Sequence, residues 1–189
     1  NYGLVNTTAD AFNVKNKMNK EIIFALYYNK ANDTGHGYWY STTKPEEAQL
    51  TQPAPVFRAL YDAQDNRLPL ISEYTEDKKG TYLLNKWFDN RNDALKGNVV
   101  ENDFPHLRYA DVVLMYAEAL NALDQRTLAL PYLNKTRTRA GLDALEAGDV
   151  PSKEAFIEAL ADERGREFAL EGHRWFDLVR LGLALDRFH

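Results

Sequence analysis

The chain has 189 residues, 44% of them hydrophobic, so it is long enough to bury a core of its own. Its formal net charge is -5, and its lysines and arginines are interleaved with acidic residues, which excludes the broad basic surface that a nucleic-acid partner needs. It contains no cysteine, which excludes disulfides, thiolate metal sites and a cysteine nucleophile within these residues.

No targeting segment is recognisable in the first residues of this sequence. Residues 1–4 show no basic stretch followed by an apolar one, so no signal peptide is visible. The sequence lacks a run of about 18 apolar residues, so no transmembrane helix is predicted. Because it also lacks an initiator methionine, we expect a processed chain or a fragment of a larger protein.

Residues 1–100 are rich in aromatic residues and carry four of the seven prolines. Two short segments, residues 21–28 and 81–84, combine β-branched and aromatic residues between turn formers, which predicts short strands. Residues 32–37 and the proline-containing stretch after them predict long loops. Loops held by a rigid scaffold often bind ligands.

One such loop holds the candidate ligand-binding residues. Because neighbouring side chains of an extended segment point to opposite faces, the three consecutive aromatic residues after Gly37 cannot all enter a core. Aromatic rings stack on the C–H faces of sugars, and polar groups beside them bind the hydroxyls. A strand edge packed on helices remains the alternative interpretation. The candidate carbohydrate-binding residues are His36, Tyr38, Trp39 and Tyr40, with Tyr74 and Trp87 as secondary candidates.

Residues 105–189 predict helices. The first is expected over residues 107–120, with Pro105 in its first turn. Its apolar stripe comprises Leu107, Ala110, Val113, Leu114 and Ala117, and Ala119 adds a further small side chain for close packing.

The second helix is expected over residues 128–140. Thr127 is its predicted N-cap, Gly141 ends it, and Pro131 is tolerable only in its first turn. The short connection predicts an antiparallel pair of the tetratricopeptide type, which must pack on further helices to bury its second face.

A third helix is expected from the predicted N-cap Ser152 to about Glu171. Glu154 lies near its positive end, and Gly172 bends or breaks it before residues 173–180. Trp175 is expected in the core.

The dense charges of residues 163–180 predict a salt-bridged helix face rather than a catalytic centre. Arg164 and Glu171 fall near the apolar stripe of that helix, so we expect them to be partly buried ion-pair partners.

We predict neither a metal nor a cofactor. The four histidines, His36, His106, His173 and His189, lack the spacing of a zinc site. Residues 62–66 have a faint rhythm of oxygen ligands, but no glycine and glutamate complete a calcium loop, and a turn is expected.

Three segments carry a family resemblance. Residues 107–121 read LRYADVVLMYAEALN, residues 133–142 read LNKTRTRAGL, and residues 163–180 read ERGREFALEGHRWFDLVR. In this order they resemble three characteristic segments of the SusD/RagB family of nutrient-binding lipoproteins. Gly165 departs from that pattern, because an arginine is commoner there, and a glycine within a helix costs about 0.5–1 kcal/mol relative to alanine.

The resemblance implies a protein without enzymatic activity that captures oligosaccharides, or in some relatives peptides, at the cell surface. It implies attachment by an N-terminal lipid to the outer membrane of a Gram-negative bacterium and partnership with a SusC-type TonB-dependent transporter. The lipidated cysteine and earlier helical pairs would lie upstream of this chain.

We therefore expect a mainly α fold divided near residue 103. Residues 104–189 should form a tetratricopeptide-like helical pair plus further C-terminal helices. Residues 1–103 should form an irregular, loop-rich region with short β-strands, the candidate ligand-binding portion.

Two other functions remain open. A tetratricopeptide-type protein–protein adaptor would need several repeats, whereas one pair is visible. A glycoside hydrolase needs two carboxylates at a defined separation, and none of the 28 acidic residues is marked out by a local signature.

Overall fold

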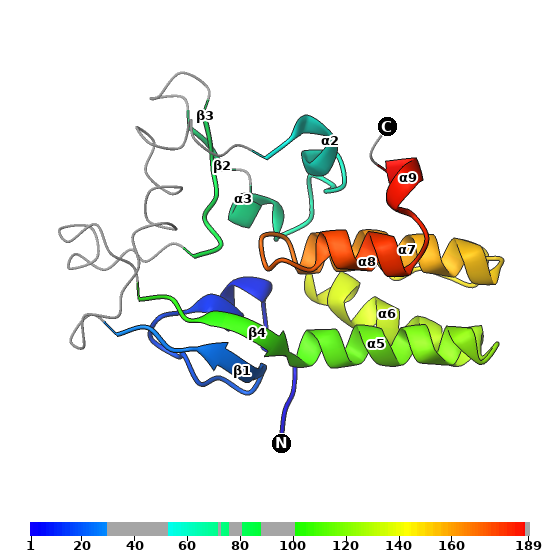
Figure 1. Cartoon of the computed structure of the whole chain (residues 1–189), viewed down its shortest axis with the longest axis horizontal. Helices are drawn as coiled ribbons and strands as arrows, with labels where there is room; N and C mark the ends of the chain where they lie inside the picture. Colours follow the sequence, from blue (N-terminus) through cyan, green and yellow to red (C-terminus); the bar gives the residue numbers. More distant parts are fainter. Residues whose placement is uncertain (30–52, 72, 76–80, 88–100, 188–189) are drawn as a thin grey trace. The chain divides into compact units, whose positions relative to one another are not determined.

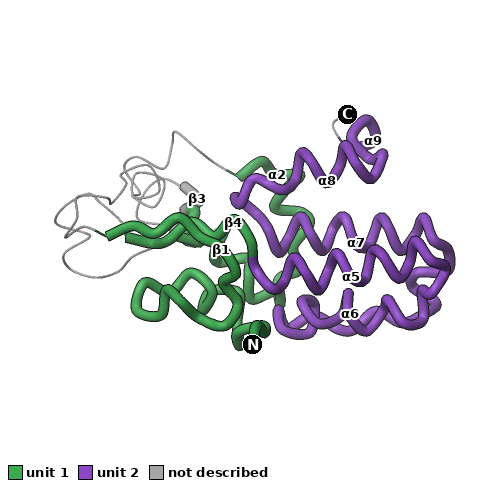
Figure 2. Tube along the Cα trace, turned by 60° about the horizontal axis from the view of Figure 1, so that its bottom comes forward, with its two compact units in different colours: residues 1–107 green, residues 108–189 purple. Residues whose placement is uncertain are grey.

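The computed structural model describes residues 1–29, 53–71, 73–75, 81–87 and 101–187 (Figure 1). The chain forms two compact units, residues 1–107 and residues 108–189 (Figure 2). The predicted fold class is confirmed, because the described residues are mainly helical and contain two small two-stranded sheets. The predicted division of the chain at residue 103 remains a prediction.

The first unit combines short helices with the two sheets. β1 pairs with β4, and β2 runs antiparallel to β3 with Tyr74 opposite Tyr82. The strands expected within residues 21–28 and 81–84 are confirmed as β1 and β3. The elements are the 3-10 helix η1 (Thr8–Phe12), β1 (Ile22–Leu26), α2 (Pro55–Arg58), α3 (Leu68–Ile71), β2 (Glu73–Thr75), β3 (Thr81–Leu83) and β4 (Phe104–Arg108).

The second unit is helical. α5 and α6 form an antiparallel pair, as predicted, and α7 packs against both of them (Figures 1 and 2). Ala110, Leu114, Leu133 and Phe156 are completely buried between these helices. The helices are α5 (Tyr109–Ala122), α6 (Arg126–Arg139), α7 (Lys153–Glu167), α8 (Arg174–Arg180) and α9 (Ala184–Arg187). Within the described ranges, no helix is both long and apolar enough to cross a bilayer.

The start of the first predicted helix was wrong. Pro105 lies in β4 instead of a helical turn, and α5 begins only at Tyr109. The residue before a proline favours extended backbone, and pairing with β1 continues that conformation to Arg108. As a consequence, Leu107 is 47% exposed instead of buried. Ala119, expected to pack closely, is exposed as well.

The start of α6 also differs from the prediction, whereas its end agrees. α6 begins at Arg126, so Thr127 lies inside it, and Pro131 stands beyond the first turn. Gly141 ends the helix with a positive φ of 82°. The amides of Gly141 and Leu142 donate to the carbonyls of Thr138 and Arg137, which is the Schellman arrangement that glycine permits.

The Ser152 cap is confirmed, because its hydroxyl accepts a hydrogen bond from the Ala155 amide at 3.0 Å. α7 ends at Glu167, earlier than expected, and the chain turns through Leu170 and Gly172, both with positive φ. The prediction that Trp175 is a core residue was wrong, since 54% of it is exposed. α8 is short and buries Asp177 and Leu178 instead.

Candidate functional site

The predicted carbohydrate-binding residues His36, Tyr38, Trp39 and Tyr40 lie outside the described residues. Their role therefore stays a prediction. Of the secondary candidates, Tyr74 belongs to β2.

Trp87 is a core residue. Only 1% of it is exposed, so its ring faces cannot receive a ligand. The ring lies edge-on to Phe12, with centroids 5.6 Å apart, and stacks on Phe104 at 5.7 Å with an interplanar angle of 8°. Aromatic contacts continue from Phe104 to His106 and on to Phe24, which is 54% exposed. These five rings link the core of the first unit to its surface.

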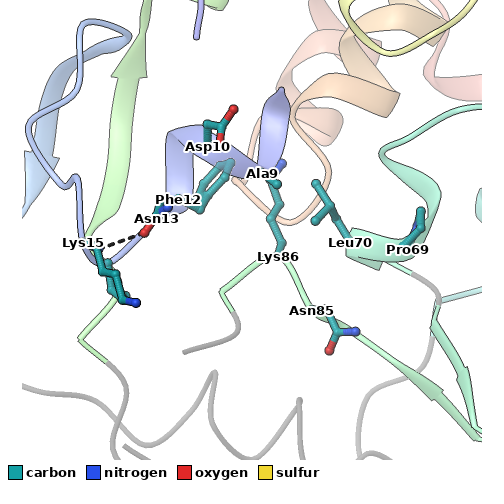
Figure 3. A pocket seen from close by; sticks show the side chains of 10 residues that line it. Ala9, Asp10, Phe12, Asn13, Lys15, Pro69, Leu70, Asn85 and Lys86 are labelled. Carbon is teal, nitrogen blue, oxygen red and sulfur yellow. Dashed lines mark hydrogen bonds between the residues drawn. The ribbon is translucent and has the colours of Figure 1, made fainter. Parts of the chain in front are cut away.

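The first unit contains a hollow of about 470 Å³ beside η1 (Figure 3). Pro69 and Leu70 of α3 contribute apolar lining. The Lys86 ammonium lies 4.8 Å from the centre of the Phe12 ring, a cation–π contact. The remaining lining residues are Ala9, Asp10, Asn13, Val14, Lys15 and Asn85.

A second hollow, of about 540 Å³, shares Asp10 and Asn13 with the first. Its lining is mostly polar and contains four asparagines from a short stretch of sequence. The other lining residues are Val5, Asn6, Asn16, Met18, Asn19 and Lys20. We call the two recesses together the η1 hollows.

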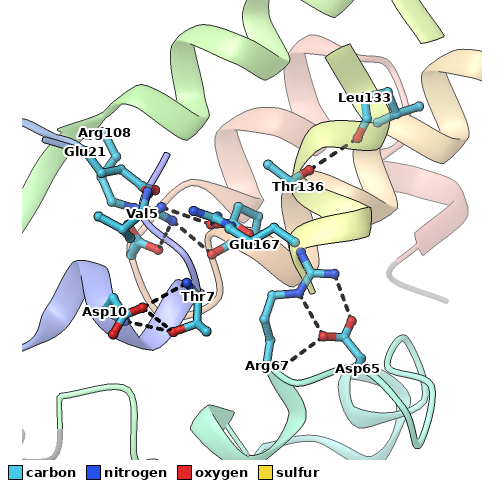
Figure 4. A network of polar contacts seen from close by, with 12 residues as sticks. Val5, Thr7, Asp10, Glu21, Asp65, Arg67, Arg108, Leu133, Thr136 and Glu167 are labelled. Atoms are coloured by element: carbon cyan, nitrogen blue, oxygen red, sulfur yellow. Dashed lines mark hydrogen bonds and ion pairs between the residues drawn. The ribbon is translucent and has the colours of Figure 1, made fainter. Parts of the chain in front are cut away.

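Local hydrogen bonds hold the backbone of the η1 hollows. Thr7 and Asp10 form a capping box: the Asp10 carboxylate accepts from the Thr7 amide at 3.0 Å, and the Thr7 hydroxyl accepts from the Asp10 amide at 3.2 Å (Figure 4). The buried Asn19 amide donates to the carbonyls of Ala11 and Asn16. The Thr-x-x-Asp pattern of the capping box is present in the sequence, although it was not among the predicted caps.

Carboxylates of the charged segment, residues 163–180, pair with Arg108, the last residue of β4, in a buried network (Figure 4). Arg108 is 1% exposed and donates through Nε to Glu171 at 2.7 Å and through Nη1 to Glu167 at 2.9 Å. Arg139 also pairs with Glu167. Arginine recognises carboxylates through several fixed donors, so this network locks the end of α7 to the start of α5 and the end of α6.

Arg164 forms the second centre of charge. It donates to Asp111 of α5 at 2.7 Å and to Asp177 of α8 at 2.8 Å. The expected burial of Arg164 and Glu171 is confirmed, but the prediction that they pair with each other was wrong. Because α7 ends before Glu171, helical spacing does not bring these two side chains together.

The network serves packing. The buried carboxylates of Asp111, Glu163, Glu167, Glu171 and Asp177 each accept from or pair with an arginine. Such groups cross-link helices, and nothing in their geometry sets one carboxyl aside as a proton donor.

Glu154 and His173 are among the groups of this unit whose pKa values are displaced. The Glu154 backbone amide and the Ser152 hydroxyl, at the start of α7, hold the pKa of the Glu154 carboxyl below its ordinary value. Burial lowers the pKa of the His173 imidazole, which stacks on Phe168 at 4.7 Å. Among the described residues, no group of three or more potential ligands gathers to hold a metal ion. Residues 62–66, weighed as a calcium loop, form a turn in which the Asp65 carboxylate binds Arg67.

The chain thus combines a helical unit that is cross-linked by buried ion pairs with a unit that contains two hollows. Residues 66–188 match the sequence model of the SusD family. The match extends over more than half of the chain, which therefore belongs to this family.

Known relatives agree with this assignment. A SusD-like protein of Formosa agariphila is 38% identical over 85 residues, which are 42% of this chain and 17% of that protein. A SusD superfamily structure from Bacteroides vulgatus has a TM-score of 0.74 at 26% identity and covers 98% of this chain and 45% of that one. Surface glycan-binding protein A from Bacteroides thetaiotaomicron shares the fold, with a TM-score of 0.73 at 20% identity, over 100% of this chain and 48% of that one. The chain thus spans less than half the length of these two structures.

Proposed function

We propose that this chain is part of a non-catalytic protein that captures oligosaccharides at the cell surface. The observation that carries the proposal is membership of the SusD family over residues 66–188. A glycan-binding protein among the structures that share the fold supports the same ligand class.

The proposal includes a place and a partner. The whole protein is held at the outer membrane of a Gram-negative bacterium by a lipid outside this sequence, and it delivers its ligand to a SusC-type TonB-dependent transporter. The second unit supports capture without turnover, because its buried carboxylates form ion pairs with arginines and so are poor candidates for a catalytic acid.

Ligand contact is assigned to the aromatic segment, with Trp39 as the central stacking residue and His36, Tyr38 and Tyr40 beside it. Stacking on an aromatic ring is a large part of the free energy with which a protein holds a sugar, because the ring covers the C–H face while polar groups bind the hydroxyls.

The test is a glycan array on the purified chain, followed by calorimetry with the glycan that binds. Trp39→Ala is expected to abolish binding while the circular-dichroism spectrum stays unchanged. Incubation of the chain with the same polysaccharide should release no reducing ends. Full affinity in Trp39→Ala contradicts the assigned contact, and release of reducing ends contradicts capture without turnover.

A further inference from the structure

The η1 hollows combine a recess of mixed apolar and polar lining with a mostly polar one, and the two share Asp10 and Asn13. We propose that they form a second carbohydrate subsite, separate from the aromatic segment, that binds a neutral sugar ring. The proposal rests on the proposed function, because it names a further place where the same class of ligand binds.

Available amide groups carry the assignment. Asn6 and Asn16 line the polar hollow and are exposed, and within the described part of the chain their side-chain amides make no hydrogen bond. An amide has two donors and an acceptor, and a sugar hydroxyl likewise donates and accepts. Two amides beside one recess can therefore bind neighbouring hydroxyls of one ring without leaving a polar group unpaired.

The backbone beneath these amides is already ordered. Asn19 is 6% exposed, and its side chain ties the carbonyls of Ala11 and Asn16 together and accepts from the Glu21 amide at 3.0 Å. The side-chain oxygen Oδ1 of Asn13 accepts a hydrogen bond from the backbone amide of Lys15 at 2.9 Å. A recess fixed in this way binds with a smaller ordering cost than a free loop.

The other recess supplies a surface for the C–H face of a sugar. Pro69 and Leu70 lie across from η1 (Figure 3). Phe12 and Val14 add to the apolar part of the lining. The volumes of about 470 and 540 Å³ fall in the range of about 300–1,000 Å³ of small-molecule sites.

The charges of the polar hollow favour a neutral ligand. Its lining contains one acidic side chain, Asp10, and one basic side chain, Lys20, so the formal charges of this hollow cancel. The neighbouring hollow adds Lys15 and Lys86, and Lys86 is 3% exposed and lies against the Phe12 ring. In the polar hollow, where no cation is in surplus, the asparagine amides suit uncharged hydroxyls better than a phosphate or sulfate group.

The experiment uses the unmodified chain and its variants with neutral oligosaccharides: maltoheptaose, cellohexaose, xylohexaose and laminarihexaose. The probe that binds best is titrated by calorimetry into the double variant Asn6→Ala/Asn16→Ala and into Asn13→Asp. Asn13→Asp keeps the oxygen that accepts from Lys15 but loses the amide donor. Gln64→Ala, which removes an exposed amide outside the hollows, is the matched control.

We expect the double variant to bind about tenfold more weakly or worse, as the loss of two hydrogen bonds predicts. Asn13→Asp should also bind more weakly, while Gln64→Ala keeps full affinity and all variants keep their melting temperature. Unchanged affinity in both asparagine variants, with binding still lost in Trp39→Ala, overturns the subsite and leaves the proposed function standing. If the unmodified chain binds none of the probes, the proposed function and the subsite are both overturned for neutral glycans.

Discussion

Arg108 shows at the scale of one residue why the charges of this chain serve cohesion. Its guanidinium contacts two carboxylates that are themselves buried, Glu167 and Glu171. Taking such charges out of water is costly, and the cost is offset only while every partner is present. The two partners lie 59 and 63 residues away along the chain, which no local spacing could reveal.

Arg108→Ala should therefore lower the free energy of unfolding by about 3–5 kcal/mol, because it removes a buried cation that both Glu167 and Glu171 bind. Urea denaturation followed by circular dichroism measures the change. Arg187→Ala is the control, since Arg187 pairs with Asp162 at 3.1 Å where both side chains are partly exposed, and about 0–1 kcal/mol is expected. Equal effects of the two substitutions would contradict the structural role of Arg108.

The structure explains why a glycine stands at position 165, where the family pattern favours arginine. A Cβ atom at this position would lie 2.8 Å from Nη1 of Arg174, the atom that donates to the Ala161 carbonyl at 2.6 Å. The glycine thus makes room for an arginine that binds the turn before it. The cost of a glycine in a helix could be predicted from the sequence, but its compensation could not, because Arg174 reaches Gly165 only after the chain turns at Gly172.

At the scale of elements, the sequence predicted the helices better than their ends. The apolar stripe located α5, and cap and glycine signals located α6 and α7, because these are properties of each segment itself. The ends depend on neighbours: β1 keeps residues 104–108 extended, and the Arg108 network holds residues beyond Glu167 in a turn. The candidate site, too, could be predicted only in part. A run of aromatic residues can be found in a sequence, whereas a hollow lined by η1, α3 and Asn85 depends on the fold.

Two predicted N-caps with different outcomes allow a direct test. Ser152→Ala should lower the free energy of unfolding by about 1 kcal/mol, because the Ala155 amide loses its acceptor. Thr127→Ala removes a similar hydroxyl from an exposed position inside α6 and should change the free energy by less than about 0.5 kcal/mol. Thermal and urea unfolding of the two variants compare them, and an equal loss in both would show that Ser152 does not act as a cap.

At the scale of the whole molecule, the second unit contains the elements of a domain. α7 packs on both members of the α5–α6 pair, and completely buried side chains from all three helices, such as Leu114, Leu133 and Leu160, form its core. Its main buried ion pairs also join residues of this unit, Arg108 and Arg164 with their carboxylates. Both the apolar core and the ion pairs are thus formed within residues 108–189. A segment that folds independently must contain its own core in this way.

We therefore expect residues 108–189, expressed alone, to give a helical circular-dichroism spectrum and to unfold in one cooperative transition. The matched control is residues 123–189, which lack α5 and with it Asp111, Leu114 and the partner face of α6. Without α5, the apolar stripes of α6 and α7 lose their shared neighbour, so this shorter fragment should unfold gradually with little cooperativity. Gradual unfolding of residues 108–189 as well would mean that the helical unit depends on the rest of the chain for its stability. Cooperative unfolding of both fragments would instead mean that the α5–α6 pair is not the centre of the core.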